Sequence, residues 1–377
     1  MVGDYLTKKW FLMTVVVAVM RLFLATSQSF AADEIKVGIM APITGLEATF
    51  GKDMENAILL AVSEINAKGG ILGKNVITIT GDEACDPQQA TAAAGNLVAE
   101  DVVAVVGGYC SPAMAPALKI YGDAGVPIVI PAANSSKLIG ANPGNGFQIN
   151  SPGIDQAITA VNLFKEKKIR KLAIIHQGDS YSKDLAFLTQ KKWKEMGQEI
   201  VAVEVVAKGG QDHSPLLTRL KNKSPDAVFW TAYCDDGALI IKQLRQGGFS
   251  KLIAVGDGSN SLKLMEVAGK AAEGVFCFSN PTIEYLPDAK AFGDSYRKKF
   301  NQEPGPYSAL SYDGMNLLAD AIKRAGTADK AAIAKALKET REFKGIAGPI
   351  SFKADNTLVR SNFVVLISKG TNWMLYK

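Results

Sequence analysis

The chain of 377 residues contains few of the residue types from which metal and catalytic sites are usually built. It has two histidines and four cysteines. Neither His176 nor His213 has a cysteine, aspartate or glutamate at the spacing of zinc ligands, so we expect no metal site. No nucleophile elbow, phosphate-binding loop or paired-glycine dinucleotide motif occurs, so we expect no cofactor. The lack of a nucleophile with an obvious base favours a binding protein over an enzyme.

Concentrated positive charge is also missing. The formal net charge is +5, and it falls to +3 once residues 1–31, which carry Asp4, Lys8, Lys9 and Arg21, are removed. The basic residues are scattered along the chain. A charge this small and this dispersed indicates a solvated surface, so we expect no nucleic-acid partner.

Long apolar runs are absent except at the N-terminus. Lys8 and Lys9 precede an apolar run over residues 11–24, and a small-x-small site ends at Ala31. This order is typical of a secretory signal peptide, residues 1–31, cleaved after Ala31. The alternative is a membrane anchor, but the run is short for a spanning helix. We therefore expect an exported, soluble protein.

Apolar runs typical of strands alternate with amphipathic helical patterns through most of the chain. Nearly continuous apolar strands between helices indicate parallel sheets that are covered on both faces. We expect strands at residues 35–40, 76–80, 102–106, 127–130, 172–176, 200–206, 227–230, 252–255 and 274–278. We expect helices at residues 52–68, 87–100, 114–124, 154–167, 183–196 and 237–246.

This alternation restarts after a passage rich in glycine, proline and asparagine at residues 140–153. The fold class we predict is α/β, with two doubly wound parallel-sheet lobes joined by a multi-crossover hinge. The first lobe comprises residues 32–150 and 281–355, and the second comprises residues 151–280 and 356–377. Several crossovers would restrict the lobes to a hinge-like closure.

Four cysteines in an exported chain favour disulfide pairing. Cys85 and Cys110 lie in loops that follow apolar strands of the same lobe, which makes them the preferred pair. Closing that loop would contribute about 3 kcal/mol by restricting the unfolded chain. For Cys234 and Cys277 the pairing stays open, and a buried free thiol is the simpler interpretation of Cys277.

Polar and aromatic residues follow several of the predicted strands. In a parallel sheet, the loops at the carboxyl ends of the strands share one edge, where open α/β sheets bind ligands. Ser111 precedes a helix, and a hydroxyl beside the N–H groups of a helix start suits a carboxylate. The loop at residues 131–135 adds backbone groups at the same edge. Tyr233 and Asp257 follow strands of the second lobe and suit an α-ammonium group.

The chain resembles the Leu/Ile/Val-binding protein family, the periplasmic substrate-binding proteins of branched-chain amino acid ABC importers. The resemblance spans nearly the whole chain after residue 31, and several motifs carry it. They are IKVGIMAPITG (35–45), INAKGGILGK (65–74), DEACDPQQA (82–90), GGYCSP (107–112), PAANS (131–135) and LSYDGMNLLADAI (310–322).

The resemblance implies a role for each of nine residues. Ser111, Ala132 and Asn134 fall where the family holds the ligand α-carboxylate and part of the α-ammonium. Tyr181, Tyr233 and Asp257 match second-lobe positions that meet the ligand, Asp257 at the α-ammonium. Phe50, Tyr109 and Tyr307 fall at side-chain-pocket positions. Cys85 and Cys110 match the family's disulfide. The family often has Thr at the place of Asn134, Glu at the place of Asp257 and Leu at the place of Tyr109.

These roles imply a monomeric periplasmic protein that closes on a neutral, branched-chain α-amino acid and delivers it to an inner-membrane ABC permease. Two alternatives remain. One is an extracellular amino-acid or amide sensor domain of the same fold. The other is an enzyme, such as a hydrolase that uses Asp257 or His176, against which the missing nucleophile–base pair argues.

Overall fold

The structure is a computed structural model that describes residues 34–376. The predicted signal peptide lies outside the described residues. Within residues 34–376, no helix combines the length and the apolar character that crossing a membrane requires.

The first sheet has five strands in the order β2-β1-β3-β4-β5, and every pair is parallel. Its strands are β1 (Ile35–Ala41), β2 (Val76–Asp82), β3 (Ala104–Gly107), β4 (Ile128–Ile130) and β5 (Gly146–Gln148). The first four are the strands predicted from the apolar runs. β5 lies in the passage rich in glycine, proline and asparagine, where no strand was predicted.

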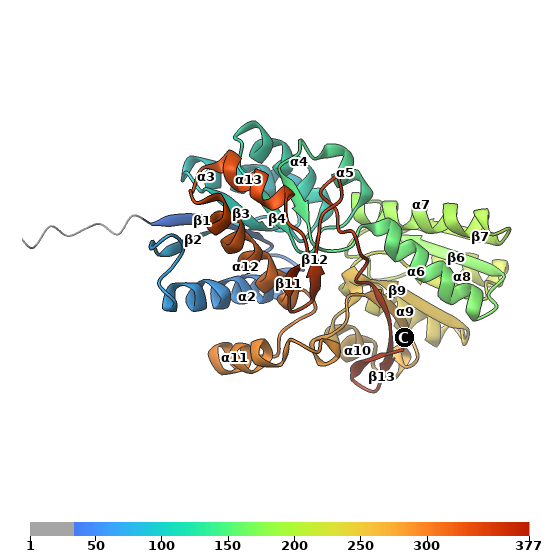
Figure 1. Cartoon of the computed structure of the whole chain (residues 1–377). Coiled ribbons are helices and arrows are strands. Elements are labelled where there is room, and N and C mark those ends of the chain that lie inside the picture. Colours follow the sequence, from blue (N-terminus) through green and yellow to red (C-terminus); the bar gives the residue numbers. More distant parts are fainter. Residues whose placement is uncertain (1–33, 377) are drawn as a thin grey trace, which may run out of the picture. The chain divides into compact units, whose positions relative to one another are not determined.

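Helices cover both faces of this sheet, as the continuous apolar strands require. On β3, Val105 packs into one core and its neighbour Val106 into the other. The helices α3 (Pro87–Ala99) and α4 (Ser111–Asp123) contribute to the core with Val105. The core with Val106 is completed by α2 (Ala48–Ala67), α12 (Ser308–Ala325) and α13 (Lys330–Lys338). Figure 1 shows α2 on the opposite side of the sheet from α3 and α4.

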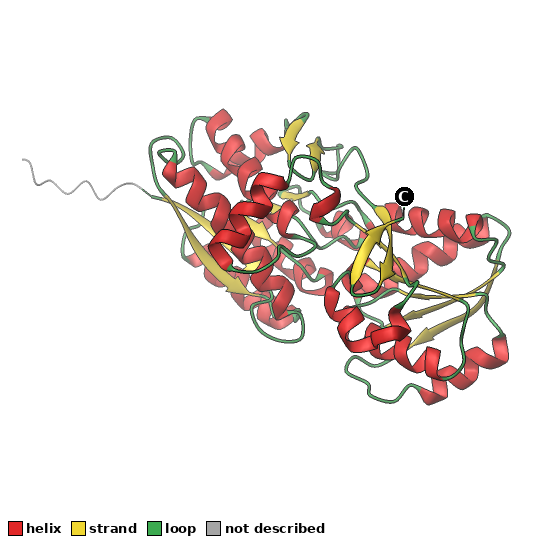
Figure 2. Ribbon diagram, turned by 90° about the horizontal axis from the view of Figure 1, so that it is seen from below, coloured by secondary structure: helices red, strands yellow, loops and turns green. Residues whose placement is uncertain are grey.

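The second sheet has seven strands in the order β14-β13-β10-β9-β8-β6-β7. The strands are β6 (Lys171–His176), β7 (Glu199–Val205), β8 (Ala227–Trp230), β9 (Leu252–Gly256), β10 (Phe276–Ser279), β13 (Val364–Lys369) and β14 (Asn372–Leu375). The pairs from β7 to β10 are parallel, and β13 and β14 extend the sheet in antiparallel fashion. Its helices include α6 (Gly153–Glu166), α7 (Ser180–Glu195), α8 (Ser214–Lys223), α9 (Cys234–Gln246) and α10 (Leu262–Ala268). Figure 2 shows strands between helices around both sheets.

The chain passes between the two sheets more than once. It leaves the first sheet after β5 and returns after β10 through α11 (Lys290–Phe300) to α12, which packs on α2. The hairpin of β11 (Phe343–Gly345) and β12 (Gly348–Ile350) follows, and β13 then rejoins the second sheet. At these passages Ser151 Oγ donates to Asn362 Oδ1 at 2.5 Å, and Asn280 Nδ2 donates to Asn150 Oδ1 at 3.1 Å. The connecting segments are thus tied to one another by side chains.

Local sequence explains where several helices begin. Asp86 caps α3 by accepting from the backbone N–H groups of Gln88 and Gln89, both at 2.9 Å, and Pro87 occupies the first turn. Asp179 caps α7 in the same way. Carboxylates at such positions satisfy N–H groups that have no partner within the helix. The two covered sheets, parallel except for β13 and β14, confirm the α/β fold class predicted from the sequence.

Candidate functional site

Both sheets share one topology, and this determines where a ligand site can form. The second sheet follows the same pattern as the first, because β6 has β7 on one side and β8 on the other, as β1 has β2 and β3. In such sheets the crevice lies beyond the carboxyl ends of the strands, where the strand order reverses. The loops after β3, β4, β8 and β9 come together and line one small pocket.

The loop after β3 requires glycine. Gly107 and Gly108 have φ values of +142° and +96°. A Cβ atom on Gly107 would lie 2.0 Å from the Met40 carbonyl oxygen, and one on Gly108 would lie 2.1 Å from Met114 Sδ. The two glycines therefore let the chain turn sharply and bring Tyr109, Cys110 and Ser111 to the edge of the sheet.

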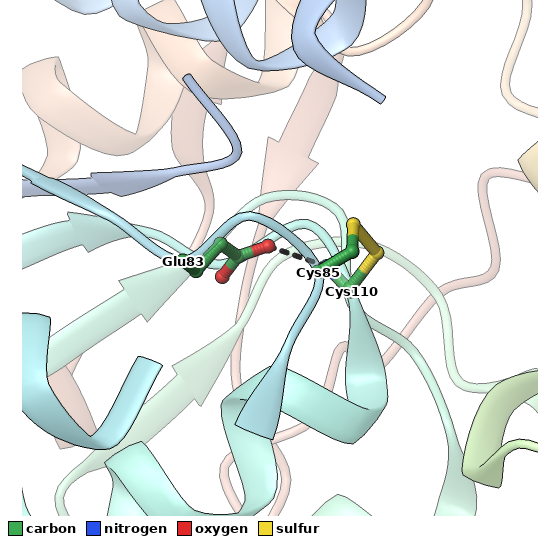
Figure 3. Close-up of side chains that lie close together, drawn as sticks. All are labelled: Glu83, Cys85 and Cys110. Carbon is green, nitrogen blue, oxygen red and sulfur yellow. Dashed lines mark hydrogen bonds between the residues drawn. A yellow bond between two sulfur atoms is a disulfide. The ribbon is translucent and has the colours of Figure 1, made fainter. Parts of the chain in front are cut away.

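The disulfide between Cys85 and Cys110, predicted from the sequence, is confirmed. Behind it, Glu83 Oε1 accepts a hydrogen bond from the backbone N–H group of Cys110 at 2.8 Å (Figure 3). The same oxygen accepts from the backbone N–H group of Tyr109 at 3.0 Å. Burial raises the pKa of Glu83 to about 7. Glu83 and both cysteine sulfurs lie within 4.8 Å of one another, but the sulfurs are bonded together and unavailable as thiolate ligands. This cluster holds the loop in place.

One end of the pocket is polar. Ser111 begins α4, and its Oγ accepts from the Ser135 backbone N–H at 3.2 Å. Asn134 Nδ2 donates to Asp257 Oδ2 at 3.0 Å, and this bond joins the loop after β4 to the loop after β9. Ala132 lines the same pocket, and its carbonyl accepts from Asn150 Nδ2 at 2.6 Å. The four predicted polar-end positions, Ser111, Ala132, Asn134 and Asp257, are thus brought together.

Asp257 is enclosed and well supplied with hydrogen-bond donors. Its side chain accepts from Tyr181 Oη at 2.7 Å and Gln156 Nε2 at 2.9 Å, and more distantly from Asn150 Nδ2 at 3.4 Å. Burial nevertheless raises its pKa above the usual range. Among the described residues, no lysine, arginine or histidine forms an ion pair with it. A carboxylate buried in this way offers a partner to a cationic group, which would favour its charged form.

The other end of the pocket is aromatic. Tyr181, at the start of α7, and Tyr233, which precedes α9, come from the second sheet, with ring centroids 5.3 Å apart. Tyr109 and Tyr307 come from the first sheet's side of the pocket, with ring centroids 5.4 Å apart. Tyr233 Oη is buried without a hydrogen-bond partner among the described residues, so a polar group of a ligand can use it. Phe50 stacks on Tyr109 and does not line the pocket itself.

Buried carboxylates that the sequence analysis missed hold these aromatic residues. Asp53 of α2 accepts from the Gly305 N–H at 2.8 Å and from Ser308 Oγ at 2.5 Å, and these bonds fix both sides of Tyr307. Glu47 Oε2 accepts from Tyr109 Oη at 3.2 Å. Burial, reinforced by the negative charge of Asp235, raises the pKa of Glu47 to about 7. Only the position of Glu47 at the end of the loop after β1 could have indicated its role.

Gln156 and Asn150 were also missed as neighbours of Asp257. Gln156 lies on α6, which follows the first passage between the sheets, and Asn150 lies in that passage. Gln156 Nε2 bonds both Asp257 and the Phe278 carbonyl, at 2.7 Å for the latter. An amide on an amphipathic helix gives no signal in a single sequence that it faces a distant strand end.

A second contact joins the loops of the two sheets beside the pocket. Asp184 of α7 accepts from Ser135 Oγ at 3.1 Å, from the Ser136 N–H at 2.6 Å and from Ser136 Oγ at 2.7 Å. Ser135 caps the short helix α5 (Ser136–Ala141), which the sequence analysis did not predict. We call these contacts between Asp184, Ser135 and Ser136 the α7–α5 latch. Together with the Asn134–Asp257 bond, these contacts hold the loops of the two sheets against each other beside the pocket.

The remaining cysteines and the acidic first turn of α9 lie outside the pocket. Cys234 and Cys277 are free, buried thiols. Asp235 and Asp236 lie in the first turn of α9, where the helix dipole favours them, but neither caps the helix. Asp235 pairs with Lys263 at 2.7 Å, and Asp236 accepts from the Gly209 N–H at 3.0 Å.

The fold and the pocket define a class of protein: a two-sheet receptor that encloses a small, polar-ended molecule between strand-end loops. A family model described as "Periplasmic binding protein" matches residues 34–372. The chain therefore belongs to the periplasmic binding protein family, as the resemblance predicted.

Known proteins of this family align along most of their length. The chain is 32% identical to "Leu/Ile/Val-binding protein homolog 2" of Brucella abortus, covering 89% of this chain and 90% of that one. It is 29% identical to the "Leucine-, isoleucine-, valine-, threonine-, and alanine-binding protein" of Pseudomonas aeruginosa, covering 90% and 91%.

Solved structures have the same fold. A leucine-binding protein from Thermotoga maritima superimposes with a TM-score of 0.85 at 29% identity, covering 91% of this chain and 98% of that one. A branched-chain amino acid transporter substrate-binding protein from Streptococcus pneumoniae, in complex with isoleucine, gives 0.83 at 31% identity, covering 90% and 98%.

Proposed function

We propose that this protein is the periplasmic substrate-binding component of an ABC importer and that it encloses a neutral α-amino acid, such as a branched-chain one. The observation that carries the proposal is Asp257, a carboxylate with 1% exposure and no cationic partner among the described residues. It faces Ser111 at the start of α4 across one small pocket. An α-amino acid carries a cation and an anion on one carbon, one group for each of these two residues. The names of the relatives support this ligand class.

In this proposal the two charged groups of the amino acid contact different strand-end loops. The α-carboxylate lies against Ser111 at the start of α4, where the positive end of the helix dipole favours an anion. The α-ammonium lies against Asp257, and Asn134 and Ala132 complete its surroundings. Tyr181 fixes the orientation of Asp257 through its 2.7 Å bond.

Closure follows from where these groups come from. We propose lobes of residues 32–150 with 281–355, and residues 151–280 with 356–377, that move about the tied connections at Ser151 and Asn280. Ser111, Ala132 and Asn134 belong to the first lobe, and Tyr181, Tyr233 and Asp257 to the second. A ligand favours the closed state only through contacts that the open state lacks, and the second-lobe residues provide them.

The same proposal implies a periplasmic location for the protein. Cleavage of the signal peptide after Ala31 would release a monomer into the periplasm, where the closed, loaded form would meet an inner-membrane permease. The function is binding without turnover of the ligand.

Thermal-shift screening of the mature protein against the twenty amino acids tests the ligand class. At least one neutral amino acid should raise the unfolding temperature, since a ligand that binds only the folded state stabilises it. Calorimetry on Asp257→Ala should then show at least a hundredfold loss of affinity, because removing one partner of a buried ion pair leaves the other uncompensated.

Asp288→Ala removes an exposed carboxylate and is the matched control, with affinity unchanged. A folded protein that responds to none of the twenty amino acids would contradict the proposed function. Near-native affinity in Asp257→Ala would remove Asp257 from the site.

A further inference from the structure

A second cavity, of about 350 Å³, lies where the chain passes between the two sheets. All three passages contribute to its wall, with Ile149 from the first, Pro281 from the second and Phe363 from the third. The rest of the wall comes from α12 and from the hairpin of β11 and β12, which lies beside that helix (Figure 1). We call this space the hinge cavity. It shares no lining residue with the strand-end pocket.

The wall of the hinge cavity is mainly apolar and carries charge at two places. Leu310 is buried in it, and Phe363 is half-buried. One charged group is the buried carboxyl of Asp313, which accepts from the backbone N–H groups of Ile346 at 2.8 Å and Ala347 at 2.9 Å. Burial raises the pKa of Asp313 to about 7, so this group carries only part of its negative charge at neutral pH.

Arg360 supplies the second charge, and the protein makes little use of its hydrogen-bond donors. Its side chain is 67% exposed, and the one ion pair it forms among the described residues, with Glu342 Oε2, spans 3.7 Å. A guanidinium presents five N–H donors in a planar arrangement that matches a carboxylate. A molecule with an apolar body and one carboxylate would therefore complement both the apolar wall and Arg360.

The first passage separates the hinge cavity from the strand-end pocket. Ile149 lines the cavity. The side chain of the next residue, Asn150, instead donates to the Ala132 carbonyl at 2.6 Å and to Asp257 Oδ2 at 3.4 Å. The passage thus has the cavity on one side and the pocket on the other. A rotation about the passages that widens the pocket narrows the cavity, and a molecule that fills the cavity opposes that rotation.

We propose that the hinge cavity binds a small hydrophobic carboxylate, paired with Arg360, and that this ligand favours the closed state of the strand-end pocket. Sites for drug-sized ligands usually enclose about 300–1,000 Å³, so a cavity at the lower end of this range suits a short-chain or aromatic acid. The binding of the carboxylate is independent of the proposed amino-acid function, whereas its effect on amino-acid affinity rests on that function.

Calorimetry with phenylacetate on the mature protein tests the binding of the carboxylate. We expect saturable binding, and at least fivefold weaker binding of phenylacetamide, which has a similar shape without the charge. Arg360→Ala should weaken phenylacetate binding at least fivefold, because it removes the paired cation. Arg170→Ala is the matched control, since it removes an exposed arginine directly before β6, and it should bind phenylacetate as the unaltered protein does. No saturable binding, or binding that Arg360→Ala leaves unchanged, would overturn the proposal.

A second titration shows where phenylacetate binds. In protein saturated with the neutral amino acid that thermal-shift screening identifies, phenylacetate should bind at least fivefold more tightly. Saturating phenylacetate should tighten amino-acid binding by the same factor, since coupling between two sites is reciprocal. Competition between the two ligands would place phenylacetate in the strand-end pocket and overturn the proposal. Binding of both ligands without mutual effect would overturn the coupling and leave the amino-acid function standing.

If none of the twenty amino acids binds, the proposed function fails, and small-angle scattering with phenylacetate alone then decides the coupling. Phenylacetate should make the protein more compact, and Arg360→Ala should abolish this change at the same phenylacetate concentration. An unchanged radius of gyration would overturn the effect on closure.

Discussion

Glu83 is a single buried residue on which the geometry of the loop after β3 depends. Its Oε1 atom accepts from two backbone N–H groups, while Oε2 has no partner among the described residues. Burial raises its pKa from 4.5 to about 7. Between these values the folded state binds more protons than the unfolded state, so this residue lowers stability as pH rises through that window. Its contribution is most favourable below about pH 4.5.

We predict that Glu83→Gln flattens this pH dependence. Glutamine keeps an oxygen for both N–H groups and carries no charge, so at pH 8 the variant should exceed the parent in free energy of unfolding by up to about 3 kcal/mol. Below pH 4.5 the difference should vanish. Urea unfolding at several pH values measures it, with Glu266→Gln as an exposed control. A variant less stable than the parent at pH 8 would show that Glu83 is ionised and favourably solvated in the folded protein.

At the same scale, the sequence was informative about residues that follow strands and uninformative about those that support them. Ser111, Asn134 and Asp257 each follow an apolar run within a few residues, which marked them as strand-end candidates, and all three line one pocket. Glu47, Glu83 and Gln156 could not, because their partners are 62, 26 and 101 residues away. A buried acid in a loop resembles a solvated one until the fold shows what covers it.

The α7–α5 latch is a contact between elements, and its effect can be measured. Asp184→Ala removes three hydrogen bonds to a charged acceptor that join the loops of the two sheets. Hydrogen bonds to charged groups contribute about 1.5–3 kcal/mol each when buried, so we predict at least a tenfold loss of amino-acid affinity. The binding surface itself is unchanged, and the loss should come from a less favourable closed state.

Calorimetry gives the affinity, and small-angle scattering with and without ligand gives the extent of closure. Glu195→Ala, on the last turn of the same helix, is the control and should behave as the unaltered protein does. Unchanged affinity in Asp184→Ala would mean that the latch does not contribute to closure.

Elements were predictable where burial made their sequence pattern strong. β8 occupies residues Ala227–Trp230, as its apolar run predicted, because both faces of a central parallel strand are buried. β5 has three residues, Gly146–Gln148, between glycines and asparagines, and nothing in that composition indicates a strand. It forms because β4 offers an unpaired edge and Phe147 fills the core beside α12. Elements that the sequence did not predict, such as β5, form through contacts with residues that are distant in the sequence.

For the whole molecule, the question is whether the two sheets unfold together. One core cluster runs without interruption from Val105 and Ile128 beside the first sheet, through the pocket tyrosines, to Ile174 and Val228 in the second. The chain also crosses between the sheets repeatedly, and side chains tie the crossings together. Neither sheet can lose its core without exposing part of the other's. We therefore predict a single cooperative unfolding transition for the mature protein.

Tryptophan fluorescence can test whether the two sheets unfold in one transition. The sequence has four tryptophans, and the proposed signal cleavage would remove Trp10. Trp193, Trp230 and Trp373 are all buried beside the second sheet, so fluorescence reports on that sheet, while far-ultraviolet circular dichroism reports on helices around both. The urea midpoints of the two signals should coincide.

A ligand at 100 times its dissociation constant should raise the free energy of unfolding by about 2.7 kcal/mol in both signals. In Asp257→Ala the midpoints should still coincide, but the same ligand concentration should move them far less, because binding and cooperativity depend on different contacts. A fluorescence midpoint distinct from that of circular dichroism would show that the sheets unfold separately and that the pocket tyrosines join them only when a ligand is bound.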